Sequence, residues 1–175
     1  MKTFIFFLFN SLIFASSINS QNWYNHPKIV EIRKEVNRIN KNINQHRYRV
    51  QKKGWSDENV GAEAKLYKDK NGNVKKLLII GGSEDSLIKG EYYYQNKKLI
   101  FSYLVSNHYS GCGTTLRNYF FNNKLIFQKK DYGTCTFDKE ICKDLNDKNN
   151  KCKRRVPFPT IIKTPTEAFK EFYGE

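Results

Sequence analysis

The sequence predicts an α+β fold: an N-terminal amphipathic helix packed on an antiparallel meander of about six strands, a short C-terminal helix and a disulfide-tied tail. Three observations lead to this fold class. Apolar residues recur at helical spacing early in the chain, and further on they alternate with polar residues. The stretch EYYYQNKKLIF (Glu91–Phe101) is also echoed 26 residues later by RNYFFNNKLIF (Arg117–Phe127). The echo indicates that one structural unit, a β-hairpin, occurs twice.

The helix is predicted over residues 27–46. Steps of three and four residues separate the members of its apolar stripe, which are Ile29, Ile32, Val36, Ile39 and Ile43. Pro27 suits the first turn of a helix, and Asn25 and His26 are the two candidates for the N-cap. A coiled-coil seam has the same spacing, but so few heptads favour packing against the protein's own core.

A first hairpin is predicted at the dipeptide Asn71–Gly72, which is a strong turn signal. With these two residues at the centre of the turn, Leu66 lies opposite Leu77. Opposed residues share a face of the sheet, so this register stacks apolar side chains on each other. The polar segment at residues 51–59 precedes this hairpin and is interpreted as a linker, because it contains a glycine and a polar cluster.

The repeated stretches are predicted to be two further hairpins. Asn96–Lys97 turns the first of them, and this register predicts three opposed pairs: Tyr94 with Leu99, Tyr93 with Ile100 and Tyr92 with Phe101. Asn122–Asn123 turns the second and predicts two: Phe120 with Leu125 and Tyr119 with Ile126. Asparagine tolerates the positive φ that such turns require. The three hairpins supply six strands, at roughly 61–68, 74–81, 89–95, 98–106, 115–121 and 124–131.

Residues 1–20 have the layout of a secretory signal peptide: a lysine, an apolar run and small polar residues. Cleavage is predicted near Ser20, with Ser17 as the alternative. The apolar run is shorter than the ~20 residues of a membrane-spanning helix, although a retained N-terminal anchor is the competing interpretation. We therefore expect a secreted or periplasmic protein without an integral membrane segment after cleavage. Residues 21–175 form its single domain, with a core at about 27–131 and a tail at 132–175.

The tail is predicted to be tied by disulfides, since an exported chain with four cysteines usually pairs them. Extending the third hairpin brings Cys112 near Cys135, which leaves Cys142 to pair with Cys152. The two other connectivities that four cysteines permit stay open. The spacing of the cysteines fits no zinc site.

A short C-terminal helix is predicted over residues 165–173. Thr164 and Glu167 form a capping-box pattern, with Pro165 just inside the start of the helix. The apolar residues expected to dock this helix on the domain are Ala168, Phe169 and Phe172.

The binding residues predicted from the sequence are aromatic and basic. Tyrosines beside lysines suit the stacking of bases, and the candidates on this aromatic-basic sheet face are Tyr92, Tyr94 and Tyr119. The densest basic cluster supplies the candidate anion contacts Lys151, Lys153, Arg154 and Arg155. The plainer alternatives stay open: the tyrosines suit a hairpin packed on a core, and the basic cluster suits a solvated loop.

No catalytic residues are predicted. The spacing of His26, His46 and His108 brings no two of them together as acid and base. The serine and glycine patterns lack the frame of a nucleophile elbow. No cofactor and no metal are expected. A small secreted hydrolase or nuclease that uses His108 is therefore only the third hypothesis.

One pattern, Y-[YF]-x-N-x-K-L-[IF]-F, occurs at Tyr93–Phe101 and Tyr119–Phe127, and more loosely at Tyr67–Leu77, after the helical segment Ile29–Val36. In this respect the chain resembles small secreted bacterial proteins in which a leading helix is followed by repeated hairpins. The resemblance covers roughly residues 27–131 and implies a helix-plus-meander fold and an exported location. It implies no activity, and it ends at the cysteine-bearing tail.

The chain carries a formal net charge of +14, which becomes +13 once Lys2 leaves with the signal peptide. Such a charge favours acidic partners, although scattered lysines also simply keep a protein soluble. The leading hypothesis is an exported non-enzymatic binding or interaction protein, whose partner is an envelope or extracellular protein or an acidic polymer. The alternative is binding of a polyanion, nucleic acid or acidic polysaccharide, by the aromatic-basic sheet face.

Overall fold

The computed structural model describes residues 22–57, 60–83, 86–108, 113–132 and 161–173. The predicted signal peptide, the four cysteines and the basic cluster at residues 151–155 lie outside these residues, so the statements about them stay predictions. None of the helices in the described part of the chain is long and apolar enough to cross a membrane.

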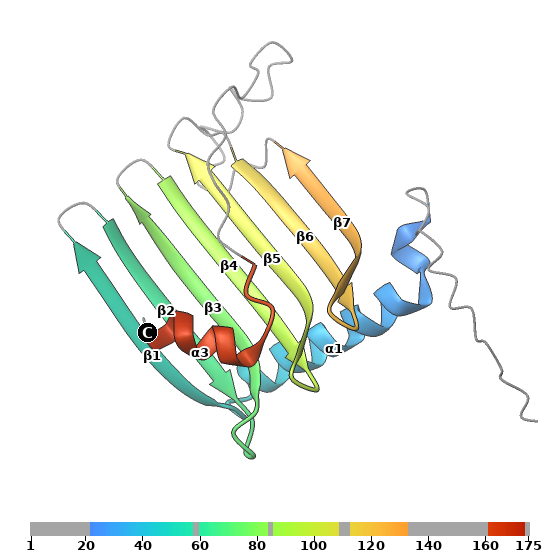
Figure 1. The fold of residues 1–175 in the computed structure, drawn as a ribbon, viewed down its shortest axis with the longest axis horizontal. Coiled ribbons are helices and arrows are strands. Elements are labelled where there is room, and N and C mark those ends of the chain that lie inside the picture. Colours follow the sequence, from blue (N-terminus) through green and yellow to red (C-terminus); the bar gives the residue numbers. More distant parts are fainter. Residues whose placement is uncertain (1–21, 58–59, 84–85, 109–112, 133–160, 174–175) are drawn as a thin grey trace, which may run out of the picture.

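A single antiparallel sheet of seven strands forms the centre of the molecule, and strands that follow each other in sequence are neighbours in the sheet. Its strands are β1 (Arg49–Asp57), β2 (Val60–Lys68), β3 (Val74–Ser83), β4 (Ser86–Gln95), β5 (Lys98–His108), β6 (Gly113–Phe121) and β7 (Lys124–Tyr132). Helix α1 (Pro27–Asn44) crosses one face near the hairpin turns, and α3 (Pro165–Tyr173) lies on the opposite face (Figure 1). The predicted helix-plus-meander architecture is thereby confirmed.

The prediction of about six strands is wrong, because the segment interpreted as a linker forms β1. This strand pairs with β2 along its whole length, from Arg49 opposite Lys68 to Asp57 opposite Val60. As an edge strand, it exposes most of its side chains and therefore lacks the apolar alternation by which strands are recognised. Among the β1 side chains that the structure describes, Trp55 is the one that packs, partly buried, against the hydrophobic core.

Helix α1 forms because its apolar stripe has the sheet to pack on. The residues that it buries there are Ile29, Ile32, Val36 and Ile39. Of the two N-cap candidates the structure uses His26, whose Nδ1 accepts a hydrogen bond from the backbone N–H of Lys28 (3.3 Å). Pro27 occupies the first turn as predicted. Before α1 lies the 3₁₀-helix η1 (Trp23–Asn25).

Both repeated hairpins turn where the sequence predicts. The residues of Asn96–Lys97 and Asn122–Asn123 all have positive φ, between 49° and 63°. Such two-residue turns match the twist of the strands that they join. Three predicted pairs are confirmed: Leu66 with Leu77, Tyr94 with Leu99 and Phe120 with Leu125.

Three other predicted pairs are wrong by one residue: Tyr93 with Ile100, Tyr92 with Phe101 and Tyr119 with Ile126. In both hairpins a β-bulge follows the second pair from the turn, so Tyr93 lies opposite Phe101 and Tyr119 opposite Phe127. The bulge turns Ile100 and Phe101 to the same face, where both pack on the α1 side. A strict two-residue alternation does not predict this bulge. The bulge explains why the echoed K-L-I-F sequence carries two consecutive core residues.

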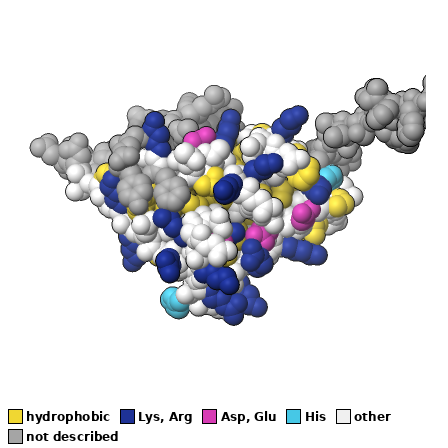
Figure 2. Space-filling model, turned by 60° about the horizontal axis from the view of Figure 1, so that its bottom comes forward, with side chains coloured by type: hydrophobic (Ala, Val, Ile, Leu, Met, Phe, Trp, Pro, Cys, Tyr) yellow, Lys and Arg dark blue, Asp and Glu magenta, His cyan; other side chains and the backbone are white. Residues whose placement is uncertain are grey.

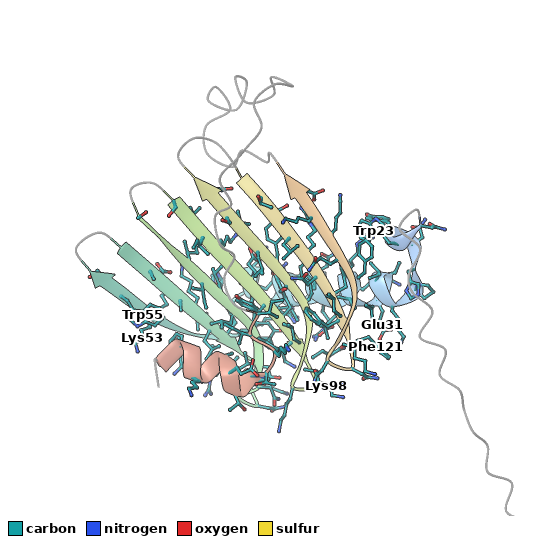
Figure 3. The ribbon with its side chains drawn as sticks, turned by 45° about the horizontal axis from the view of Figure 1, so that its top comes forward. Trp23, Glu31, Lys53, Trp55, Lys98 and Phe121 are labelled. Carbon is teal, nitrogen blue, oxygen red and sulfur yellow. The ribbon has the colours of Figure 1, made fainter. Side chains whose placement is uncertain are left out.

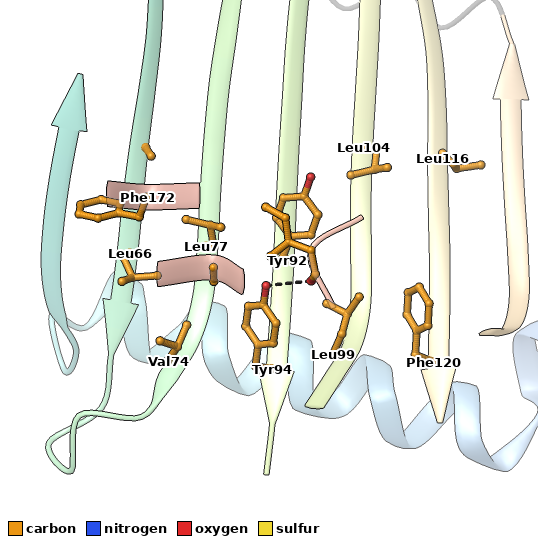
Figure 4. Close-up of a cluster of buried hydrophobic side chains, with 13 residues drawn as sticks. Leu66, Val74, Leu77, Tyr92, Tyr94, Leu99, Leu104, Leu116, Phe120 and Phe172 are labelled. Atoms are coloured by element: carbon orange, nitrogen blue, oxygen red, sulfur yellow. Dashed lines mark hydrogen bonds between the residues drawn. The ribbon is translucent and has the colours of Figure 1, made fainter. Parts of the chain in front are cut away.

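The face opposite α1 is closed by the C-terminal segment. Ile162, Ala168 and Phe172 are buried against side chains of β2 to β6, including Tyr92 and Tyr94 (Figure 4). The Tyr94 hydroxyl donates a hydrogen bond to the backbone carbonyl of Ile162 (3.0 Å). The predicted helix at 165–173 is therefore confirmed, as is its docking through two of the three expected side chains.

Candidate functional site

The three tyrosines predicted to bind are in the interior of the protein. Tyr92 and Tyr94 are 0% exposed and belong to the cluster on the α3 side. Tyr119 is 4% exposed and belongs to the cluster on the α1 side, with Trp23 and Phe127 beside it. Because the sheet separates Tyr119 from the other two, the described residues contain no exposed platform built from these three rings. The plainer alternative, hairpin aromatics that pack a sheet, matches this placement.

A buried polar network joins α1 to the sheet beside these aromatics. The Lys76 ammonium donates hydrogen bonds to Glu91 Oε2 (2.7 Å), to the Tyr93 hydroxyl (2.7 Å) and to Asn40 Oδ1 (3.3 Å). The Tyr93 hydroxyl lies 2.6 Å from the same Glu91 oxygen. Lys89 reaches the second oxygen, Oε1, at 2.6 Å. Each polar side chain of this network thus has a partner, as buried polar groups require.

The network fixes the charges of its members. Burial alone would raise the pKa of the Glu91 carboxyl, but the charge of Lys76 and the hydrogen bonds from Lys76, Lys89 and Tyr93 outweigh it and hold this pKa at about 2. Burial and the neighbouring Glu91 charge raise the pKa of the Tyr93 hydroxyl far above its ordinary value. Glu91 is therefore ionised and Tyr93 neutral across the physiological range. These groups hold α1 in place and are poorly suited to proton transfer.

The histidines that the structure describes have structural positions. His26 caps α1, and His46 follows the end of α1 with a positive φ of 54°. The side chain of His108 lies outside the described residues. Within the described ranges, no group of three or more His, Cys, Asp or Glu side chains could hold a metal ion.

The surface that remains as a candidate site is a row of hairpin turns at one end of the sheet, which we call the turn row. It consists of the turns Lys70–Gly72, Asn96–Lys97 and Asn122–Asn123. Because β2 to β7 form three consecutive hairpins, these turns lie side by side at the end of the sheet that α1 crosses (Figure 1). All their side chains are exposed.

The turn row is rich in cations that have no acidic partner. Exposed lysines in and beside the turns are Lys70, Lys97, Lys98 and Lys124, and none of them forms an ion pair with another described residue. Asp69 is the carboxylate of the first turn, and Lys75 (3.3 Å) together with the N–H groups of Asn71 and Asn73 (both 2.9 Å) already engage it. Figure 2, which brings this end of the molecule forward, shows many Lys and Arg side chains scattered among uncharged ones and few acidic side chains.

Two grooves separate the turns. One, of about 330 Å³, lies between the first and second turns and is lined by Asn73, Val74, Lys75, Asn96 and Lys97. The other, of about 210 Å³, lies between the second and third turns and α1. Its lining includes Glu31, Lys98 and the exposed ring of Phe121, which Figure 3 labels. The buried side chains of Ile32 and Leu99 and the amides of Gln95 and Asn122 also line it.

The sequence also carries a signal for this surface, because a lysine and an asparagine recur in or beside each of the three hairpin turns. The meander places these turns at the same end of the sheet. With α1 and α3 on opposite faces, the turns stay exposed at that end. Since α3 lies far along the chain, the local sequence of the hairpins does not reveal this.

No family model matches the chain, and no curated protein and no solved structure is significantly similar to it. The resemblance to small secreted bacterial proteins therefore stays a prediction, and the site has to be interpreted from its own chemistry.

Proposed function

We propose that this chain is an exported, non-enzymatic binding protein that engages an acidic partner through the turn row. One observation carries the proposal. Helix α1 packs on one face of the sheet and α3 on the other, while the end of the sheet formed by the turns presents exposed lysines and amides that have no acidic partner among the described residues. Unpaired surface cations attract acidic molecules and accelerate their association.

The buried titratable groups support a binding role rather than catalysis. Glu91, Lys76 and Tyr93 are occupied with each other and with Asn40 of α1. A catalytic acid or base needs a pKa near the working pH and access to its substrate. The network offers neither, because its carboxyl pKa is held at about 2 and Lys76 is only 9% exposed.

Export rests on residues 1–20 and is tested on the expressed protein. Intact mass measurement of the secreted or periplasmic product is expected to show a chain that begins at Gln21, or at Ile18 if cleavage follows Ser17. Retention of the full chain in the cytoplasm would contradict this part of the proposal.

The binding role is tested by capture of partners from the native envelope and secretome, with the mature protein as bait. The proposal expects an acidic protein or polymer that elutes when salt is raised, because exposed charge pairs are screened. If no partner is enriched and the protein instead turns over a substrate, the proposal fails.

A further inference from the structure

The repeat gives the turn row a regular spacing. Each turn is separated from the next by two strands, and neighbouring strands lie about 4.8 Å apart. The turns therefore recur at intervals of about 10 Å, and the row extends about 20 Å from the first turn to the third. A surface of this shape matches a linear partner that crosses the strands at their ends.

Each turn presents the same pair of chemical groups, an ammonium and a carboxamide. The pairs are Lys70 with Asn71, Lys97 with Asn96 and Lys124 with Asn123. Carboxamides donate to and accept from hydroxyls, and ammonium groups bind carboxylates and sulfates. The second and third turns are tight, with both central residues at positive φ, so little order has to be gained on binding.

Among the described residues, the turn row offers a single exposed aromatic ring for stacking. Tyr92, Tyr94 and Tyr119 are buried, whereas Phe121 is 42% exposed and lines the groove between the second and third turns, with the Lys28 ammonium 4.6 Å from the centre of its ring. With one ring for the whole row, single-stranded nucleic acid would stack at most one base here and would otherwise gain only phosphate contacts. Hydroxyl-rich acidic polymers, in contrast, can bind both groups that the turns present: their acidic groups bind the ammonium groups, and their hydroxyls bind the carboxamides.

We propose that the turn row binds a linear acidic polysaccharide laid across the hairpin ends, with about one acidic group per turn and sugar rings in the two grooves. This inference rests on the proposed function and names its ligand class and site. The groove between the second and third turns suits a sugar ring, because its lining includes the exposed ring of Phe121, which offers an apolar surface to the sugar's C–H face. The amides of Gln95 and Asn122 on its rim accept or donate to the hydroxyls.

The first experiment measures the affinity of the mature, oxidised protein for acidic oligosaccharides by titration calorimetry. Heparin and oligogalacturonate fragments, from disaccharide to dodecasaccharide, are compared at low and at physiological salt. Affinity is expected to rise with length until the fragment spans the row of about 20 Å, and then to level off. It is also expected to fall as salt is raised, because bound cations of the polymer are released.

The second experiment locates the site with two matched triple variants. The turn variant combines Lys70→Gln, Lys97→Gln and Lys124→Gln, and the control combines Lys52→Gln, Lys89→Gln and Lys129→Gln on the sheet face that bears α1. Both change the net charge equally. The turn variant is expected to bind about tenfold more weakly or worse, with a salt slope reduced by about one per lysine. The control is expected to change affinity by less than about threefold. Unfolding midpoints of both variants confirm that they are folded.

Two further ligands test the ligand class. An oligothymidylate of equal charge and anionic phospholipid vesicles are expected to bind more weakly than the oligosaccharide. Equal loss of affinity in both triple variants, stronger binding of the oligothymidylate or the vesicles, or no oligosaccharide binding at low salt would each overturn the inference. In those cases a partner captured from the secretome still supports the proposed function, whereas failure of the capture removes the function as well.

Discussion

The three consecutive tyrosines Tyr92, Tyr93 and Tyr94 have two different roles because a strand directs neighbouring side chains to opposite faces. Tyr92 and Tyr94 pack in the core on the α3 side, where the Tyr94 hydroxyl donates a hydrogen bond to the Ile162 carbonyl. Tyr93 points toward α1 and belongs to the network of Lys76 and Glu91. The three tyrosines, whose sequence suggests an exposed surface for stacking, are thus divided between the two core clusters on opposite faces of the sheet.

Tyr94→Phe is expected to lower the free energy of unfolding by about 1–2 kcal/mol, because the buried Ile162 carbonyl loses its donor. Tyr119→Phe is the control, since its hydroxyl makes no hydrogen bond with another described residue, and it is expected to stay within about 0.5 kcal/mol. Urea unfolding measures both changes. Equal effects would show that the C-terminal segment is not held by this bond.

Gly90→Ala is expected to destabilise the protein by about 1–3 kcal/mol. A β-carbon at this position would lie 2.8 Å from the ring of Tyr92, which is fully buried and would have to shift within the core. At the exposed Gly61 of β2 a β-carbon meets no atom within 4 Å, so Gly61→Ala serves as the control. Thermal unfolding of the two variants compares them, and an unchanged midpoint for Gly90→Ala would contradict the packing of Tyr92 over this strand.

The Glu91 network makes stability depend on pH in a defined window. Its carboxyl pKa is about 2 in the folded protein and near 4.5 when unperturbed, so folding favours the ionised form. The stabilisation is complete above pH 4.5 and is lost as the pH falls toward 2. Glu91→Gln is expected to cost about 3 kcal/mol at pH 7, because Lys76 is left buried without its counter-charge, and to flatten this acid dependence.

Chemical denaturation at several pH values between 2 and 7 measures the Glu91→Gln effect. Glu31→Gln is the control, since the Glu31 side chain is 61% exposed and its removal should change stability by less than about 0.5 kcal/mol. If the wild-type protein and Glu91→Gln lose stability in parallel below pH 4.5, another carboxylate is responsible.

At the scale of elements, the sequence was sufficient wherever one segment determines its own structure. The stripe from Ile29 to Ile39 predicted α1, the paired turn residues predicted three hairpins, and Thr164 with Glu167 predicted α3. Predictions failed where contacts with other elements determine the structure of a segment. β1 is a strand because β2 offers it an edge, and the bulges at Ile100 and Ile126 exist because α1 accepts two consecutive side chains from one strand.

The docking of α3 is tested by Phe172→Ala, which is expected to cost about 3 kcal/mol because a buried ring is removed from the α3 side. Lys170→Ala, on the exposed side of the same helix, should change stability by less than about 0.5 kcal/mol. Hydrogen exchange reports the same contact: the amide of Leu99, which donates to the Lys163 carbonyl, should exchange faster in Phe172→Ala. Unaltered exchange and stability would contradict the packing of α3 against the sheet.

At the scale of the whole molecule, the position of the candidate site follows from the order of the layers. With α1 on one face and α3 on the other, the repeated segments expose their turn residues at the end of the sheet. The hairpin sequence predicted an aromatic-basic sheet face that includes Tyr94, whereas the structure buries this side chain against Ile162, far along the chain. The repeat itself, first evident in Glu91–Phe101, supplies both the core and the evenly spaced turns.

The most direct test of the turn row as the binding surface is an amide chemical-shift map of the mature protein during titration with an acidic octasaccharide. The largest shift changes are expected at Lys70–Gly72, Asn96–Lys97 and Asn122–Asn123, with smaller changes along the centres of the strands. Changes concentrated instead around Lys89, Arg117 and Lys129 on the sheet face, or no changes at low salt, would contradict recognition by the turn row.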